Sequence, residues 1–234
     1  MTNGSWITRQ RWEKIHFLHF RGAAEVVRAA LPPELELDLW ENEAVLSVVP
    51  FRMTRVRFPY LPPFPGIGSL WELNLRTYVR YASKPGVYFF TLESNNPVAT
   101  WIAQKGFGLP YANAKFRVQA HENHFAMEHQ RADIRTKIQM HTLVDDSSPQ
   151  EDPFAIWATE RYALLNVRAG RVFRGALRHE RWPLKSAKVD IFEGNFLSLV
   201  PGAENFRFCG AGSCERLDVS FRPFEELSTK LGMN

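Results

Sequence analysis

The chain has 234 residues, 45% of them hydrophobic and 13% aromatic, which is enough apolar material for a sizeable core or an aromatic-lined cavity and argues against disorder. Its 29 Lys and Arg residues outnumber its 25 Asp and Glu by only four and are spread along the chain, which argues against a nucleic-acid partner. There is no run of about 18 apolar residues and no N-terminal signal pattern, so we expect no membrane partner and a cytoplasmic protein.

Strand patterns dominate the chain, and residues 1–234 are expected to form a single domain. Segments rich in Val, Phe, Tyr and Thr predict strands at roughly 14–20, 35–40, 43–52, 71–81, 86–93, 113–120, 123–130, 132–141, 160–168, 171–180, 186–193 and 215–222. Two segments predict helices: 23–31, which is followed by prolines, and 97–105, which begins with a proline. Many short strands favour an antiparallel barrel or a sandwich, with the helices as lids over an open edge or the barrel mouth.

Three segments are expected to be irregular. Residues 58–66 include four prolines, which have no amide donor for a β-ladder, so they should form a loop. Residues 145–152 are acidic and should form an exposed connection. Both cysteines, Cys209 and Cys214, flank a glycine-rich run, which we expect to be a loop with two free thiols, because structural zinc needs four ligands.

Polar side chains alternate with mostly apolar ones in the strand expected at 71–81. Side chains two residues apart share one face of a strand, so Glu72, Asn74, Arg76 and Tyr78 should form a row. Glu72 and Arg76 would lie roughly 13 Å apart, too far to satisfy each other, and each would need a further partner or a ligand if buried. The alternative is a solvated face. The scarcity of polar residues on neighbouring strands favours a site.

A second candidate lies in residues 106–115, where a glycine-containing segment precedes Tyr111 and Lys115. A lysine whose pKa is lowered by burial or by another cation can act as a Schiff-base nucleophile. No neighbouring cation accompanies Lys115 in the sequence, which favours an exposed lysine on the face shared with Arg117 and Gln119.

A third candidate combines Arg161 and His179. The planar guanidinium of Arg161 can bind a carboxylate, or it can pair with Glu160 or Glu180 at a rim. His179 titrates near neutral pH and can serve as an acid or base, whereas a single histidine without a partner is more often structural.

Other motifs argue against metal and cofactor sites. His121, His124 and His129 lack the His-Glu-x-x-His spacing of metalloproteases, so no metal is expected. The chain also lacks a Gly-x-Ser-x-Gly elbow and a phosphate-binding glycine loop, and no cofactor is expected.

Seven motifs, in order along the chain, carry a resemblance to a known family: Phe17-Leu18-His19-Phe20, Val49-Pro50-Phe51-Arg52-Met53, Glu72-Leu73-Asn74-Leu75-Arg76-Thr77-Tyr78-Val79, Gly86-Val87-Tyr88-Phe89-Phe90-Thr91-Leu92, Gly108-Leu109-Pro110-Tyr111, Thr159-Glu160-Arg161-Tyr162 and His179-Glu180-Arg181-Trp182-Pro183-Leu184. With these motifs the chain resembles the YqjF-like family of uncharacterised bacterial proteins, whose fold is similar to that of acetoacetate decarboxylase. The resemblance implies a mainly β (α+β) fold: an antiparallel β-barrel with a few flanking helices, a central cavity, a carboxylate matching Glu72 and assembly into homo-oligomers.

The resemblance also marks a departure from that enzyme. In acetoacetate decarboxylase a Schiff-base lysine lies next to a second lysine just after a proline. The matching place here is Pro110-Tyr111-Ala112, where tyrosine and alanine replace the two lysines, and Lys115 is out of register. The resemblance therefore implies the barrel and its cavity without the usual amine chemistry.

The leading hypothesis is a protein that binds, and as an enzyme would transform, a small organic acid or keto compound in the cavity, with a lyase-like activity on a small carboxylate. Arg76 or Arg161 would pair with the ligand's carboxylate, and Glu72 would act as base or orienter. The lining would also include Asn74, Tyr78, Tyr111 and His179. Two alternatives remain: a non-enzymatic ligand carrier or structural barrel, and a decarboxylase with Lys115 as its Schiff-base lysine.

Overall fold

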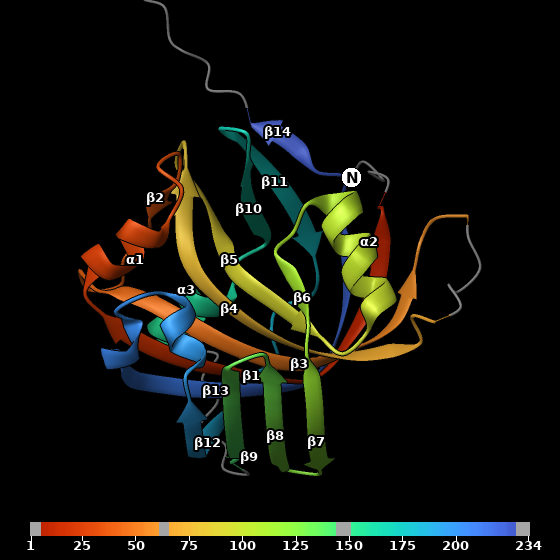
Figure 1. Ribbon diagram of the computed structural model, residues 1–234, viewed down its shortest axis with the longest axis vertical. Helices are drawn as coiled ribbons and strands as arrows, with labels where there is room; N and C mark the ends of the chain where they lie inside the picture. The colour runs from red at the N-terminus through yellow and green to blue at the C-terminus, as the bar shows by residue number, and fades with distance from the viewer. Residues whose placement is uncertain (1–5, 61–65, 144–150, 228–234) are drawn as a thin grey trace, which may run out of the picture.

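The computed structural model describes residues 6–60, 66–143 and 151–227 (Figure 1). The strands are β1 (Thr8–Gly22), β2 (Glu36–Leu37), β3 (Ala44–Arg57), β4 (Ser69–Tyr81), β5 (Lys84–Ser94), β6 (Tyr111–Asn113), β7 (Lys115–His121), β8 (His124–Arg131), β9 (Ile134–Thr142), β10 (Ala163–Arg168), β11 (Arg171–Arg178), β12 (Lys185–Gly194), β13 (Arg207–Phe221) and β14 (Glu225–Leu227). The helices are α1 (Ala24–Ala30), α2 (Pro97–Phe107) and α3 (Pro153–Thr159), with short 3-10 helices η2 (Phe196–Leu199) and η3 (Ala203–Asn205).

The strands form a mainly β fold whose central part is a closed ring. The order β11-β10-β5-β4-β3-β1-β13 returns to its start because β13 also pairs with β11, with Leu177 opposite Phe221. Most of these pairs are antiparallel, as expected from the sequence. The β5–β10 contact, where Leu164 lies opposite Val87, is parallel, and so is the pairing of β5 with β6.

A second layer continues from the ring and covers one side of it. Strands β12, β9, β8 and β7 follow β13 in the sheet, and Figure 1 shows them beneath β1 and β3. Phe125 and Met127 of β8 belong to the same buried cluster as Leu73 and Leu75 of β4. The outer face of β4 is therefore buried, and its opposite face points into the ring.

The alternation in β4 separates two environments. Leu73, Leu75 and Val79 pack in the cluster between the layers, whereas Glu72 and Asn74 lie on the opposite face and line a cavity. A strand that is buried on both faces usually reads as a continuous apolar run. The polar residues of β4 are the exception that locates the site.

The two helices expected from the sequence have different places in the fold. The segment 97–105 forms α2, whose first turn is capped by Asn96, and its residues Ala99 and Ile102 line the cavity. In contrast, the segment 23–31 forms α1, and its Val27 packs in the cluster between the layers. Of these two helices, only α2 contributes described side chains to the lining of the cavity.

Several boundaries differ from the sequence expectations. The strand expected at 160–168 begins at Ala163, because the preceding residues 153–159 form α3. This helix is capped by Asp152, whose side chain accepts a hydrogen bond from the backbone amide of Phe154. Of the strand expected at 35–40, only Glu36–Leu37 is regular.

The run from Cys209 to Cys214, expected to be a loop, belongs to β13. Glycine is tolerated there because β13 pairs with both β1 and β12, and Gly212 lies close to the backbone of Lys185.

The proline-rich segment and the acidic connection are only partly described. Strand β3 ends at Arg57 and β4 begins at Ser69, so the described residues of segment 58–66 lie outside any strand, and residues 61–65 lie outside the described part. Residues 144–150 of the acidic connection also lie outside it. Within the described ranges, no helix has the length and apolar character of a membrane span.

Candidate functional site

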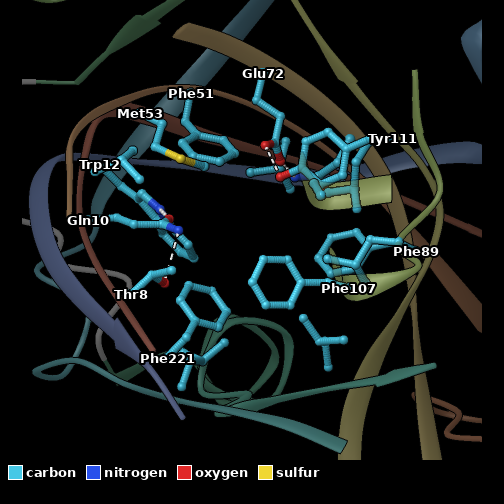
Figure 2. A pocket seen from close by; sticks show the side chains of 18 of the residues that line it. Thr8, Gln10, Trp12, Phe51, Met53, Glu72, Phe89, Phe107, Tyr111 and Phe221 are labelled. Carbon is cyan, nitrogen blue, oxygen red and sulfur yellow. Dashed lines mark hydrogen bonds between the residues drawn. The ribbon is translucent and has the colours of Figure 1, made fainter. Parts of the chain in front are cut away.

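The ring encloses a cavity of about 150 Å³ with mainly apolar walls. Figure 2 shows the aromatic side chains around it, with Glu72 and Tyr111 together on one side. The polar side chains that β4, β6, the end of α3 and the segments after α3 and β11 add to the lining are Glu72, Asn74, Arg76, Tyr111, Thr159, Arg161 and His179. We call this set the polar end of the cavity. A cavity of this size and character can hold a small organic molecule.

Glu72 is the central group of the polar end. Its side chain is buried, the Tyr111 hydroxyl donates to Oε2 at 2.7 Å, and Asn74 Nδ2 donates to Oε1 at 3.2 Å. Within the described residues no cation pairs with it. Burial raises the pKa of Glu72 to about 7, although both hydrogen bonds act in the opposite direction. A carboxyl group with this pKa can accept or donate a proton at neutral pH.

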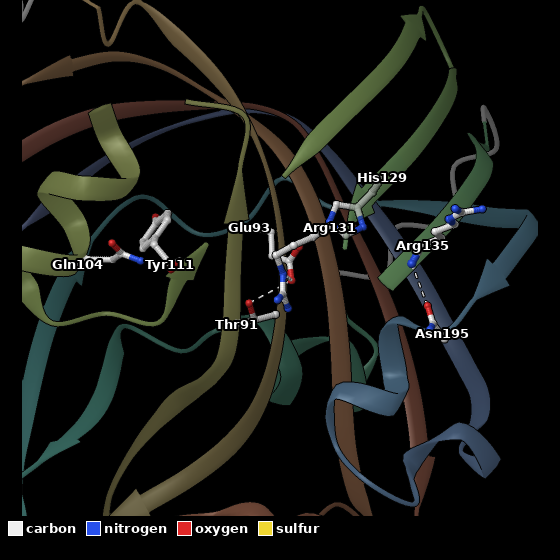
Figure 3. Close-up of polar contacts among 8 residues, drawn as sticks. All are labelled: Thr91, Glu93, Gln104, Tyr111, His129, Arg131, Arg135 and Asn195. Carbon is white, nitrogen blue, oxygen red and sulfur yellow. Dashed lines mark hydrogen bonds and ion pairs between the residues drawn. The ribbon is translucent and has the colours of Figure 1, made fainter. Parts of the chain in front are cut away.

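Tyr111 is positioned by backbone contacts from two elements. It begins β6, which pairs with β5, and Gln104 of α2 donates to its carbonyl oxygen at 2.7 Å (Figure 3). Burial, together with the nearby Glu72 carboxylate, raises the pKa of Tyr111 well above its ordinary value. The phenol therefore keeps its proton and acts as a donor to Glu72.

Arg76 brings a positive charge to the same cavity. Its Nη2 donates to the carbonyl oxygen of Ala158 at 3.3 Å, and its guanidinium lies 5.3 Å from the centre of the Phe17 ring. No carboxylate in the described part of the chain forms an ion pair with Arg76. This guanidinium can therefore bind an external anion.

His179 contributes a neutral acceptor. Its Nδ1 donates to the backbone oxygen of Glu180, which leaves Nε2 as the unprotonated nitrogen. Burial lowers the pKa of His179, and the positive charge of Arg76 adds to this effect. The ring is therefore uncharged near neutral pH.

Three buried polar atoms of this end have no partner among the described residues. They are Asn74 Oδ1, Arg76 Nε and His179 Nε2. Two are acceptors and one is a donor, and all three side chains line the cavity. Buried polar groups normally have partners, so this combination fits a polar ligand or ordered water.

Three other residues singled out in the sequence have different surroundings. Arg161 lines the cavity, but its Nη1 donates to Asp38 Oδ2 at 2.7 Å, so its charge is balanced by a carboxylate that sequence reasoning did not consider. Tyr78 does not line the cavity; its hydroxyl is hydrogen-bonded to Ser47. Lys115 is exposed on β7, at the edge of the second layer and away from the cavity.

The structure adds a polar group that the sequence reading missed. On β1, Trp12 Nε1 donates to Gln10 Oε1 at 2.9 Å, and Gln10 Nε2 donates to Thr8 Oγ1 at 3.4 Å. All three side chains line the cavity (Figure 2). The alternation of Thr8, Gln10 and Trp12 is a signal for this group, but the sequence pattern predicts a strand only from residue 14, whereas β1 begins at Thr8.

A second buried acid is part of a different arrangement. Glu93 is fully buried; His129 Nε2 lies 2.6 Å from its Oε2, and Arg131 Nε donates to its Oε1 at 2.8 Å (Figure 3). This group joins β5 to β8 across the two layers. Its charges are compensated internally, unlike that of Glu72. Among the described residues, no three His, Cys, Asp or Glu side chains are grouped to hold a metal ion.

Comparisons of the sequence with known proteins point to one family. Residues 9–203 match the model of the family DUF2071, described as an uncharacterized conserved protein. The chain is 33% identical over 192 residues to the uncharacterized protein YqjF of Bacillus subtilis (strain 168), covering 81% of this chain and 79% of that protein.

Comparisons of the structure identify the fold. An acetoacetate decarboxylase from Legionella pneumophila matches with a TM-score of 0.67 and 13% identity, covering 98% of this chain and 90% of that one. An acetoacetate decarboxylase-like enzyme from Sphingomonas wittichii RW1 matches with a TM-score of 0.69 and 9% identity, covering 96% and 94%. The enduracididine biosynthesis enzyme MppR, complexed with pyruvate, matches with a TM-score of 0.64 and 13% identity, covering 97% and 92%. The fold is thus acetoacetate decarboxylase-like.

Proposed function

The chain belongs to the DUF2071 family, and from this membership and the geometry of its cavity we propose that it binds a small organic acid or keto compound. The carboxylate of the ligand pairs with Arg76, and its reactive or carbonyl group lies against Glu72 and Tyr111. The observation that carries the proposal is the unbalanced charge at the polar end: Glu72 and Arg76 line one cavity, and neither has an ion-pair partner among the described residues.

The roles within the site follow from the chemistry of each group. Arg76 offers a planar set of donors that matches a carboxylate. Glu72, with a pKa of about 7, exchanges a proton with a carbonyl or an adjacent carbon in an enzyme, or orients the ligand in a carrier. The unpartnered acceptors of Asn74 and His179 receive hydrogen bonds from the ligand. The proposal assigns no role to Lys115, because this residue is not part of the cavity lining.

Relatives of the fold support this ligand class without deciding the reaction. A protein with an acetoacetate decarboxylase-like fold, MppR, is known in complex with pyruvate. At 13% identity this likeness extends to the fold alone. The ligand class therefore depends on the residues of this chain.

The proposal is tested by binding measurements on wild type and Arg76→Ala. Pyruvate, acetoacetate and larger carboxylates are screened by thermal shift, and ligands that stabilise the wild type are measured by calorimetry. Loss of a charged hydrogen-bonding group should weaken binding of these acids about 10- to 100-fold, whereas uncharged amide analogues should bind both proteins alike.

Arg117→Ala is the matched control, because it removes the same charge from an exposed position on β7. It should bind the acids like the wild type. The proposal fails if no acid stabilises the wild type more than it stabilises Arg76→Ala. If Glu72→Gln and Arg76→Ala only lower stability and leave every ligand response unchanged, the polar end is a structural network instead.

A further inference from the structure

We propose that the ligand of this cavity is an aromatic acid that carries an oxygen substituent at the end of its ring remote from the carboxylate. This inference rests on the proposed function, since it assumes that the acid group is bound at the polar end. It adds a second point of recognition, made by Gln10 and Thr8 of β1.

The orientation of the Gln10 amide is set by its neighbour. The indole nitrogen of Trp12 can only donate, so the group that faces it at 2.9 Å must be the oxygen of Gln10. The amide nitrogen consequently faces Thr8 Oγ1, at 3.4 Å. The amide is therefore held in one of its two orientations.

This arrangement leaves donors that are not used within the described residues. The Gln10 amide nitrogen has two hydrogens, of which Thr8 accepts one, and the Thr8 hydroxyl keeps its own proton while accepting. Thr8 is buried and both side chains line the cavity. The set offers donors from Gln10 and Thr8, and the Gln10 and Thr8 oxygens can each accept a further hydrogen bond, so it suits a hydroxyl group of the ligand, which both donates and accepts.

The space between the two polar groups is bounded by aromatic rings. Figure 2 shows Gln10 and Thr8 across the open space from Phe89 and Phe107, with Phe51 and Phe221 on other sides. Aromatic pairs gain from edge-to-face or offset contacts in addition to the burial of apolar area. These walls therefore favour an aromatic ring over an aliphatic chain of similar size.

The strand register indicates the length of the ligand. Phe51 lies opposite Glu72, and Arg52 lies opposite Glu13 of β1, so Glu72 is level with a position four residues beyond Gln10. Arg76 lies opposite Ser47 and is therefore further from Gln10 along the strands. Four residues of a strand span about 13 Å, part of which is covered by the two side chains that point inward. A molecule the size of pyruvate bound at the polar end therefore cannot contact Gln10, and the ligand must be longer, as a ring with an acidic arm is.

The test compares two acids that differ by one oxygen. Binding of 3-(4-hydroxyphenyl)propionate and 3-phenylpropionate to the full chain is measured by calorimetry, with pyruvate and acetoacetate as short acids. In the wild type the hydroxylated acid should bind about 2- to 10-fold more tightly than its parent, the gain expected for one neutral hydrogen bond. Gln10→Leu and Thr8→Val should each reduce this ratio and leave 3-phenylpropionate binding nearly unchanged.

Gln119→Leu is the control for loss of an amide, because Gln119 is exposed on β7. It should keep the wild-type ratio. Equal binding of the two aromatic acids to the wild type overturns the inference, and so does a ratio that survives in both Gln10→Leu and Thr8→Val. If the short acids bind and the aromatic acids do not, the inference fails while the proposed function stands. If none of the four acids binds, both fail.

Discussion

At the scale of single residues, two buried carboxyl groups have different partners and therefore different chemistry. Glu93 contacts His129 and Arg131, both of which can carry positive charge. Among the described residues, Glu72 is hydrogen-bonded to the neutral groups of Tyr111 and Asn74 and forms no ion pair. Burial without a cation disfavours the charged form, so the pKa of Glu72 rises to about 7. This makes Glu72 the group whose protonation should respond to pH in the physiological range.

The protonation of Glu72 should appear in the stability of the protein. Its pKa is about 7 in the folded state against an ordinary value of 4.5, so between these values only the folded state holds the proton. The stabilisation that this proton provides is complete below pH 4.5 and is lost as pH rises through 7. Relative to Glu72→Gln, the wild type should lose about 3 kcal/mol of unfolding free energy over this range. Urea unfolding at pH 5 and pH 8 measures the difference.

The comparison with Glu72→Gln removes the contribution of the histidines. Burial lowers the pKa of both His16 and His19 to about 3, so these residues destabilise the fold as pH falls below 6.5, opposite in sign to Glu72. Both proteins contain them, so their contributions cancel in the difference. Parallel stability curves for the wild type and Glu72→Gln would show that Glu72 does not titrate in this range.

At the scale of elements, the site depends on β4 and on the contacts that hold its neighbour β5. Strand β4 directs Leu73 and Leu75 into the cluster between the layers and Glu72 into the cavity. The next strand, β5, has the same division: Leu92 lines the cavity, and Glu93 reaches β8. The position of the cavity wall is thus coupled to the polar contact between the layers.

Removal of the Glu93 carboxylate should destabilise the fold strongly. In Glu93→Ala, Arg131 and the buried His129 lose their partner, and breaking a buried charged pair costs about 3–5 kcal/mol. Because Arg131 is partly exposed, the loss should fall in the lower part of this range. Chemical unfolding measures it. Asp218→Ala, which removes the exposed partner of Arg11, is the control and should change stability by less than about 1 kcal/mol. Equal effects in the two variants would contradict the role assigned to Glu93.

At the scale of the whole molecule, the cavity exists because the strands close into a ring. Closure requires the parallel contact between β5 and β10, where Gly86 and Val87 lie beside Ala163 and Leu164. A Cβ atom on Gly86 would lie 3.0 Å from the backbone oxygen of Ala163. The absence of a side chain therefore permits the close approach of these two strands.

Substitution of Gly86 should weaken the closure. Gly86→Ala places a methyl group against the backbone of β10, and such overpacking typically costs about 1–3 kcal/mol. Differential scanning calorimetry should show a lower melting temperature and weaker stabilisation by any acid that binds the wild type. Gly68→Ala is the matched control, because a Cβ there has no atom of the described residues within 4 Å, and the change in stability should be less than about 0.5 kcal/mol. If Gly86→Ala has the same melting temperature as the wild type, the two strands can move apart without loss of stability.

Local patterns in the sequence were sufficient for much of the fold. Strand periodicity predicted most strands, and the proline and glycine around residues 97–106 predicted α2. Patterns failed where local signals were weak or ambiguous. Helix α3 has only seven residues, and its main sequence signal is Asp152 before a proline. The glycine-rich sequence within β13 is typical of a loop, although it forms part of a strand. Strand β1 begins with polar residues, which concealed Gln10.

Alternation within one strand is a local property, so the residues of β4 alone are enough to predict which of its side chains share a face. The partners of those side chains depend on how distant strands come together. Arg161 pairs with Asp38, 123 positions away, and Glu93 meets His129 across two layers. Neither pair can be read from spacing, because contacts between distant strands depend on register and ring closure. These same contacts leave Arg76 without a carboxylate among the described residues, and that is the basis of the proposed site.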